Sequence, residues 1–126
     1  MEKEEITIGN LAKVSLQGKL IRYYFIANKI NEEEIKEILD AGRNLRNKIE
    51  GNYVLIVNVG SLSGMSIEAR KLSEEEQRKY PPDKLAMVIH NPVQRVMSAF
   101  FTKLHPFDFP YKFFDREEDA IKWLQD

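Results

Sequence analysis

The chain of 126 residues contains no cysteine, no surplus of basic residues and no long apolar run. Without cysteine it can form neither a disulfide nor a thiol nucleophile, and such a composition is typical of a reducing compartment. Its 19 basic and 20 acidic residues give a net charge of −1, which argues against nucleic acid as a partner. No uncharged apolar stretch approaches the roughly 18 residues that span a bilayer, so we expect no stable membrane insertion.

Sequence patterns of common enzymes and of exported proteins are also missing. There is no phosphate-binding G-x-x-x-x-G-K-[ST] or dinucleotide-binding G-x-G-x-x-G pattern, no metal-ligand spacing and no Ser–His–acid order. His90 follows a strand-like run, where an acid–base catalyst could lie, but a structural role is the simpler interpretation. The first residues lack the pattern of a signal peptide. We therefore expect a cytoplasmic protein that is not an enzyme and needs no cofactor or metal.

The most informative stretch covers residues 53–70, YVLIVNVGSLSGMSIEAR. It opens with a run of β-branched and aliphatic residues, typical of a strand buried on both faces of a parallel sheet. Gly60 and Gly64 flank Ser61 and Ser63 in the loop that follows, and Ser66 can cap the next helix. A strand, a polar loop and a helix start place free N–H groups at the carboxyl edge of a sheet, where ligands and regulatory groups bind in open α/β folds.

The first half of the chain predicts a hairpin followed by a helix. Residues 5–16 and 20–26 have the composition of two strands in an antiparallel hairpin. Asn31 can cap a helix, with Glu34 at the reciprocal position of a capping box and Gly51 as the stop. Three basic residues near the end of this helix suit its dipole, and we expect them to be solvated: Arg43, Arg46 and Lys48.

The second half predicts strands that alternate with helices. The segment after Ser66 is expected to form two short helices or one irregular helix, and its sequence ARKLSEEEQRK is too charged to be deeply buried. A strand at 84–90, a helix capped by Asn91 with Gln94 closing its box, a short strand and a final helix follow. The order ββαβαβαβα predicts a single α/β domain over residues 1–126. It has an N-terminal hairpin and then βα units, in a mostly parallel mixed sheet of about five strands with about four flanking helices.

Three segments together resemble the STAS domain, the sulfate-transporter and anti-sigma-factor-antagonist family: VNVGSLSGMSIEARKL, LAMVIHNPVQRVMSAFF and FPYKFFDREEDAIKWL. The resemblance covers nearly the whole chain. Within the family, the chain looks most like the small stand-alone bacterial STAS-like proteins, whose role is mostly uncharacterised. It implies a STAS-like fold and a regulatory module that binds a protein partner, such as an anti-sigma factor or a kinase-like regulator. The chain would be a monomer or a homodimer.

Many STAS proteins are controlled by phosphorylation of a serine at the start of the helix after the central strand. The family's acceptor segment resembles D-S-S-G-L. When this chain is laid on it, Ser66 takes the place of the aspartate, and Ile67 and Glu68 take the places of the two serines. The acceptor serine is thus replaced by a fixed negative charge, and Ser66 is the nearest hydroxyl and the candidate phosphorylation site. The resemblance and the loop together predict a partner-binding surface made of Ser61, Ser63, Ser66, Glu68, Arg70, His90, Asn91 and Arg95.

A second hypothesis comes from the similarity of this fold to the lipid-carrying CRAL-TRIO domains, which hold apolar ligands. The helix from Val93 to Leu104, with Phe107 and Phe109, would then supply the wall of a pocket, with a cavity beside Phe100, Phe101 and Phe107. A helix packed on a sheet needs the same apolar stripe. At this length a cavity for a whole lipid would remove much of the core, so carriage of a small apolar ligand ranks second.

Overall fold

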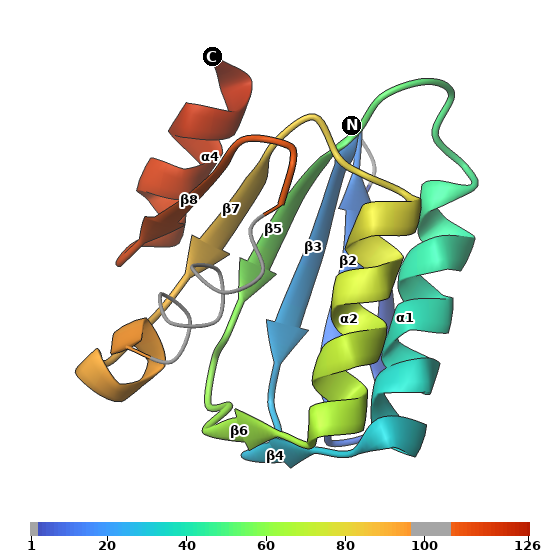
Figure 1. Cartoon of the computed structure of the whole chain (residues 1–126). Coiled ribbons are helices and arrows are strands. Elements are labelled where there is room, and N and C mark those ends of the chain that lie inside the picture. The colour runs from blue at the N-terminus through green and yellow to red at the C-terminus, as the bar shows by residue number, and fades with distance from the viewer. Residues whose placement is uncertain (1–2, 97–106) are drawn as a thin grey trace.

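Figure 1 shows the computed structural model of the chain, which describes residues 3–96 and 107–126. Its strands are β1 (Lys3–Ile8), β2 (Ala12–Gln17), β3 (Leu20–Phe25), β4 (Lys29–Ile30), β5 (Val54–Asn58), β6 (Gly64–Met65), β7 (Leu85–Val88) and β8 (Tyr111–Phe114). Its helices are α1 (Glu32–Arg46), α2 (Ile67–Lys79) and α4 (Glu117–Gln125), and residues 92–96 are helical as well.

Six strands form the main sheet in the order β1-β2-β3-β5-β7-β8, and β4 pairs with β6 in a separate two-stranded sheet. The first three strands are antiparallel, whereas β3, β5, β7 and β8 run parallel. This confirms the predicted α/β class. The main sheet has six strands where about five were expected, because residues 5–16 contribute to two strands and not one. Gly9 has a positive φ of 48°, and the Leu11 N–H donates to the Ile8 carbonyl at 2.9 Å, which closes a turn between them.

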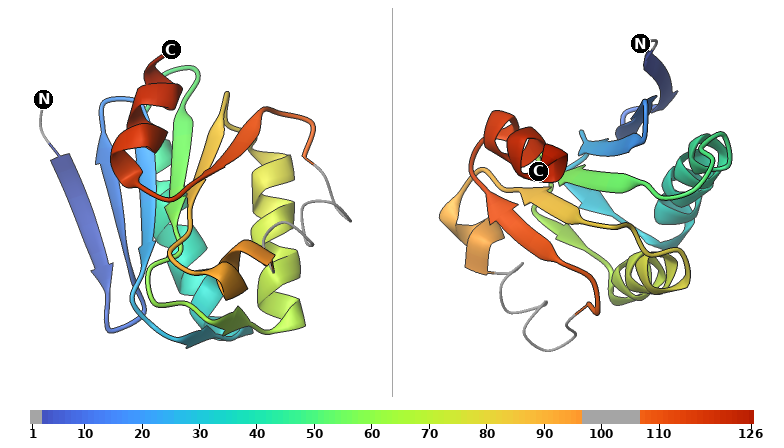
Figure 2. Two further views of the ribbon diagram at one scale, coloured as in Figure 1. Left: turned by 90° about the vertical axis from the view of Figure 1, so that its left-hand side faces the viewer. Right: turned by 90° about the horizontal axis from the view of Figure 1, so that it is seen from above.

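The fold has three layers, with α1 and α2 on one face of the sheet and α4 on the other (Figures 1 and 2). Leu55 of β5 belongs to the core cluster on the α1 side, and its neighbour Ile56 packs with Ala120 and Leu124 of α4. Successive side chains of a strand point to opposite faces, so β5 is buried on both, as its apolar run predicted.

The helix starts follow the predicted capping residues. Asn31 Oδ1 accepts the Glu34 N–H, and Glu34 Oε1 accepts the Asn31 N–H, both at 2.9 Å, which completes the capping box. α2 is a single helix, and Ser66 Oγ accepts the Ala69 N–H at 3.1 Å at its start. The expectation that this segment is too charged for burial is wrong for Glu74 and Glu76, of which only 8% and 7% is exposed. α1 ends at Arg46, before the predicted stop.

Close packing of α1 on the sheet depends on Gly42. A Cβ atom at this position would lie 1.8 Å from the Tyr23 hydroxyl oxygen of β3. The glycine therefore lets the Tyr23 ring end directly beneath the helix, where 6% of the residue is exposed. This packing places α1 close to β3.

Candidate functional site

The loops after β5 and β7 are joined by the side chain of Gln94. This residue is 5% exposed, and its Nε2 donates to the carbonyls of Leu62 at 2.7 Å and Gly60 at 3.2 Å. Its Oε1 accepts the His90 N–H at 2.8 Å, while its own N–H donates to Asn91 Oδ1 at 2.9 Å. Asn91 thus caps the helix as predicted, but the Gln94 side chain bonds His90 rather than the cap residue. The two loops are held as one surface at the carboxyl edge of the sheet.

The structure places most of the predicted site residues on this end of the molecule. Exposed among them are Ser61, Ser63, Glu68, His90, Asn91 and Arg95, whereas Ser66 and Arg70 are partly buried. The Ser61–Ser63 loop and the His90–Asn91 turn are brought together by Gln94, and Glu68 lies in the first turn of α2. Arg95 forms an ion pair with Asp115 after β8. Arg70 lines a cavity under α2 and is therefore only partly a surface residue.

The three candidate serines differ in what their hydroxyl groups do. Ser66 Oγ accepts the helix-capping bond described above, and Ser63 Oγ donates to the Asn28 carbonyl at 2.9 Å. Ser61 is exposed, and no hydrogen bond of its hydroxyl is found within residues 3–96 and 107–126. The turn and cap roles considered for these serines are therefore present at Ser63 and Ser66. Phosphorylation of Ser66 stays a prediction.

Apolar side chains at this end of the molecule are exposed, which the sequence reasoning missed. Ile67 at the start of α2 is 66% exposed, and Val93 and Val96 in the helical segment after β7 are 64% and 67% exposed. The two valines were expected on a buried stripe, and this expectation is wrong. Figure 1 shows the start of α2, the small β4–β6 sheet and residues 92–96 at the same end. We call the following exposed residues the edge surface: Ser61, Ser63, Ile67, Glu68, His90, Asn91, Val93, Arg95 and Val96.

A chain of hydrogen bonds runs from the edge surface to α4. His90 Nε2 lies 2.7 Å from Asn58 Oδ1, and Asn58 Nδ2 donates to Glu117 Oε2 at 2.8 Å. Arg22 of β3 donates to the same carboxylate through two nitrogens, with Nη2 at 2.9 Å from Oε2. Burial raises the pKa of the Glu117 carboxyl, but the hydrogen bonds from Arg22 and Asn58 outweigh it and leave that pKa below its usual value.

This arrangement fixes which His90 nitrogen faces inward. Asn58 turns its amide nitrogen to the carboxylate, so its oxygen faces His90, and it also accepts the Gly60 N–H at 3.0 Å. The His90 Nε2 must therefore carry the hydrogen and donate it to the Asn58 oxygen. The bonds hold His90 in place at the edge surface, consistent with the structural role considered for it.

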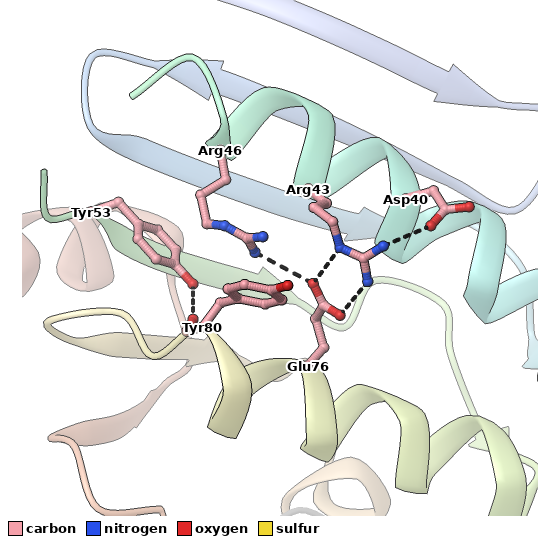
Figure 3. Close-up of polar contacts among 6 residues, drawn as sticks. All are labelled: Asp40, Arg43, Arg46, Tyr53, Glu76 and Tyr80. Carbon is pink, nitrogen blue, oxygen red and sulfur yellow. Dashed lines mark hydrogen bonds and ion pairs between the residues drawn. The ribbon is translucent and has the colours of Figure 1, made fainter. Parts of the chain in front are cut away.

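A second polar cluster lies between α1 and α2 (Figure 3). Arg43 Nη2 donates to Glu76 Oε1 at 2.7 Å, and Arg46 Nη1 lies 3.4 Å from Glu76 Oε2. The Arg46 guanidinium also lies over the Tyr80 ring, 4.0 Å from its centroid. Arg46 has only 14% of its side chain exposed, so the expectation of a solvated basic helix end is wrong here. Lys48, the third basic residue, pairs with Glu4 of β1.

An apolar cavity of about 190 Å³ lies between the sheet and the helices α1 and α2. Its wall comes from β3, β5, β7 and both helices, and includes Phe25, Ile38, Val57, Met87 and Phe107. Phe107 borders the cavity as the apolar-ligand hypothesis expected, and Phe109 stacks on it with ring centroids 4.8 Å apart. The other two phenylalanines named for that wall, Phe100 and Phe101, lie outside the described residues.

Two side-chain oxygens of α2 interrupt the apolar wall. Glu74 and Gln77 both line the cavity, and in the part of the chain that the structure describes the buried Oε1 atom of each has no hydrogen-bond partner. The other Glu74 oxygen lies 3.4 Å from Arg78 Nη1. The cavity therefore combines an apolar body with two acceptor atoms on one helix face.

With the fold and these sites described, the chain can be compared with known proteins. The model of one family, described as a domain of unknown function, DUF7793, matches residues 15–126. The chain belongs to the DUF7793 family. Among curated proteins, none matches it.

A solved structure supports the fold of this DUF7793 chain. It is the crystal structure of an uncharacterised protein from the DUF3478 family with a SpoIIAA-like fold, from Shewanella loihica PV-4. The two share 15% identity over 98% of this chain and 92% of the other, with a TM-score of 0.63. The predicted STAS-like fold is confirmed. At this identity the likeness extends to the fold alone, and the family match does not name STAS, so membership of that family stays a prediction.

Residues 3–96 and 107–126 of this DUF7793 chain show no group of three or more metal-ligating side chains. None of the helices in this part of the chain is both long and apolar enough to cross a membrane. The sequence reasoning did not single out Asn58, Gln94 or Glu117 as site residues. Only Asn58 carried a signal, because it is a polar residue inside an otherwise apolar strand. Glu117 and the loop carbonyls bonded by Gln94 have their partners far away in the sequence, and Gln94 was expected only to close the local capping box.

Proposed function

We propose that this chain is a non-enzymatic regulatory module that binds a protein partner through the edge surface. The observation that supports this most is the exposure of Ile67, Val93 and Val96 at one end of the fold. Exposed apolar side chains rimmed by polar and charged groups are typical of protein interfaces. Here Glu68 and Arg95 supply charges of opposite sign beside them.

The rigidity of the edge surface also supports the proposal. Gln94 ties the two loops together, and the Asn58–Glu117 bonds hold His90. A surface that is already ordered loses less conformational entropy when a partner binds. The STAS-like fold adds support at the level of architecture, and the sequence resemblance points to an anti-sigma factor or a kinase-like regulator as the partner.

The test is the affinity for a protein partner purified with the chain from its own cells. We expect Ile67→Asp to raise the dissociation constant at least tenfold. An anchor side chain at the centre of an interface typically contributes about 2 kcal/mol or more to binding. Thr7→Asp is the matched control, since Thr7 is exposed on β1, the outermost strand on the opposite side of the sheet from β7 and β8. Both variants should melt within a few degrees of the wild type. Equal affinity of the two variants would contradict the proposal.

Ser66 is the proposed regulatory position on this surface. A phosphate there would lie at the N-terminus of α2, where the helix dipole favours negative charge, next to the fixed charge of Glu68. Mass spectrometry of the protein isolated from its own cells tests this directly. A phosphate mapped to Ser66 supports the switch, and a uniformly unmodified chain favours constitutive binding.

A second candidate function is the binding of a small apolar ligand, and the cavity of about 190 Å³ favours it. This volume is below the roughly 300–1,000 Å³ of drug-sized ligand pockets. A whole lipid therefore does not fit, and the candidate is restricted to molecules of a few non-hydrogen atoms.

A further inference from the structure

The unpaired oxygens of Glu74 and Gln77 are the least explained feature of the structure. Nearly all buried polar atoms in folded proteins have a hydrogen-bond partner, because an unpaired one loses its hydration without compensation. Glu74 is 8% exposed, and within the described residues its Oε1 has no hydrogen-bond partner. Gln77 lies three residues further along α2, on the same helix face, and its Oε1 is unpaired too. Two acceptors are thus held together at one wall of the cavity.

Among residues 3–96 and 107–126, no side chain of the other walls donates a hydrogen bond to either of these two atoms. The surfaces opposite α2 are formed by apolar side chains of the sheet, among them Phe25, Val57 and Met87. Apolar residues of similar shape would fill the same space and would avoid the free-energy cost of burying unpaired polar atoms. Their presence is explained if the missing donor belongs to a bound molecule.

We propose that the cavity binds a small molecule with an apolar body and a hydrogen-bond donor, a hydroxyl or an amino group, placed between Glu74 and Gln77. The proposal rests on the second candidate function and names the class of its ligand. A carboxylate head, as in a fatty acid, is disfavoured because it would meet the Glu74 carboxylate and a carbonyl oxygen, which are both acceptors.

The size of the cavity limits the ligand. A cavity of ~150 Å³ with apolar walls binds benzene, and the cavity here is about 190 Å³. By proportion it has room for roughly eight non-hydrogen atoms. Benzyl alcohol, benzylamine and ethylbenzene each have this size and differ only in the group at the end of the side chain. They are therefore suitable probes, with benzoate as the acidic comparison.

The experiment measures dissociation constants of these probes for the full chain by NMR titration of methyl resonances that line the cavity. The variants are Glu74→Met and Gln77→Met, which keep the side-chain length and remove the acceptor, with Glu75→Met as the matched control on the exposed side of α2. The quantity compared is the affinity for benzyl alcohol or benzylamine relative to ethylbenzene, since this ratio cancels the general effect of apolar burial.

We expect the relative affinity for the donor-bearing probes to fall about fivefold or more in Glu74→Met and Gln77→Met, and to stay unchanged in Glu75→Met. A preference for benzylamine over benzyl alcohol would identify the head group as cationic, and the reverse would identify it as neutral. Benzoate should not bind.

Two results would overturn the proposal and are distinguishable. If ethylbenzene binds and the ratio is the same in the wild type and in Glu74→Met, the cavity is a site for apolar molecules and the assigned polar contact is wrong. If no probe shifts the cavity resonances at millimolar concentration, water or the chain itself occupies the space, and the second candidate function fails as well. Neither result affects the protein-binding proposal.

Discussion

Glu76 is the residue whose replacement tests the packing of α2 on α1 most directly. Its carboxylate is 7% exposed and contacts two guanidinium groups of α1, those of Arg43 and Arg46. The substitution Glu76→Gln keeps the shape of the side chain but removes its charge. Arg46, with 14% of its side chain exposed, then loses its charged partner between the helices and keeps the Tyr80 ring and the Tyr53 hydroxyl as neighbours.

The size of the effect follows from the burial of the two arginines. Removing one partner of a buried ion pair typically costs 3–5 kcal/mol, because the other charge stays buried without compensation. Arg43 has 40% of its side chain exposed and keeps its 3.3 Å contact with Asp40, so its share is screened by solvent and small. We therefore expect Glu76→Gln to lower the free energy of unfolding by about 2–3 kcal/mol, a drop of roughly 10 °C in Tm for a domain of this size.

Urea unfolding followed by circular dichroism measures this change. Glu75→Gln is the control, because Glu75 is exposed and its replacement should change stability by less than about 0.5 kcal/mol. Replacing both Arg46 and Glu76 by methionine should restore most of the loss, since no charge is then left buried. If Glu76→Gln is as stable as Glu75→Gln, the ion pairs do not hold the two helices together and the reasoning is refuted.

Two further predictions concern the opposite layer and the central loop. Glu117→Gln should lower the free energy of unfolding by about 2 kcal/mol at pH 6. This difference from the wild type should shrink as the pH falls below about 4, because a carboxylate with a lowered pKa contributes stability that is lost when it is protonated. Urea unfolding over pH 3–6 measures the difference, and a constant value would contradict the prediction. Gly60→Ala should destabilise by at least about 3 kcal/mol, since Gly60 has φ of 55° and its new Cβ would lie 1.9 Å from the Phe25 carbonyl oxygen. Gly9→Ala, with φ of 48° and open space around it, should cost only about 1 kcal/mol, and equal melting temperatures of the two variants would be the contrary result.

The elements that the sequence predicted correctly are those specified by nearby residues. The run at 54–59 has no polar face except at Asn58, and such a strand can only lie between two layers of helices. Asn31 and Glu34 satisfy each other within one turn, so the start of α1 is encoded locally. The split of residues 5–16 into two strands was missed, although the alternation of apolar residues breaks at Gly9-Asn10, between Ile8 and Leu11.

Features that depend on distant partners could not be predicted in this way. The segment ARKLSEEEQRK shows that α2 is polar, but Glu76 is buried because α1, 30 residues or more earlier in the chain, presents Arg43 and Arg46 to it. The edge surface was predicted in its polar residues, since loops after parallel strands meet at one edge. Its apolar part was missed, because the spacing of Val93 and Val96 fits a buried helix face equally well. The cavity results from side-chain packing between β3, β5, β7, α1 and α2, and no pattern in the sequence indicates it.

The order of strands in the sheet has a consequence for how the chain can fold during synthesis. Each new strand, from β1 to β8, is added beside the previous strand of the main sheet, and none is inserted between two that are already paired. The sheet can therefore grow outward as the chain leaves the ribosome, without opening earlier hydrogen bonds. The last helix, α4, then brings Glu117 to Arg22 and Asn58. Arg22 of β3 and Asn58 of β5 thus receive their carboxylate partner only when α4 arrives, so this helix completes a core whose sheet is already built.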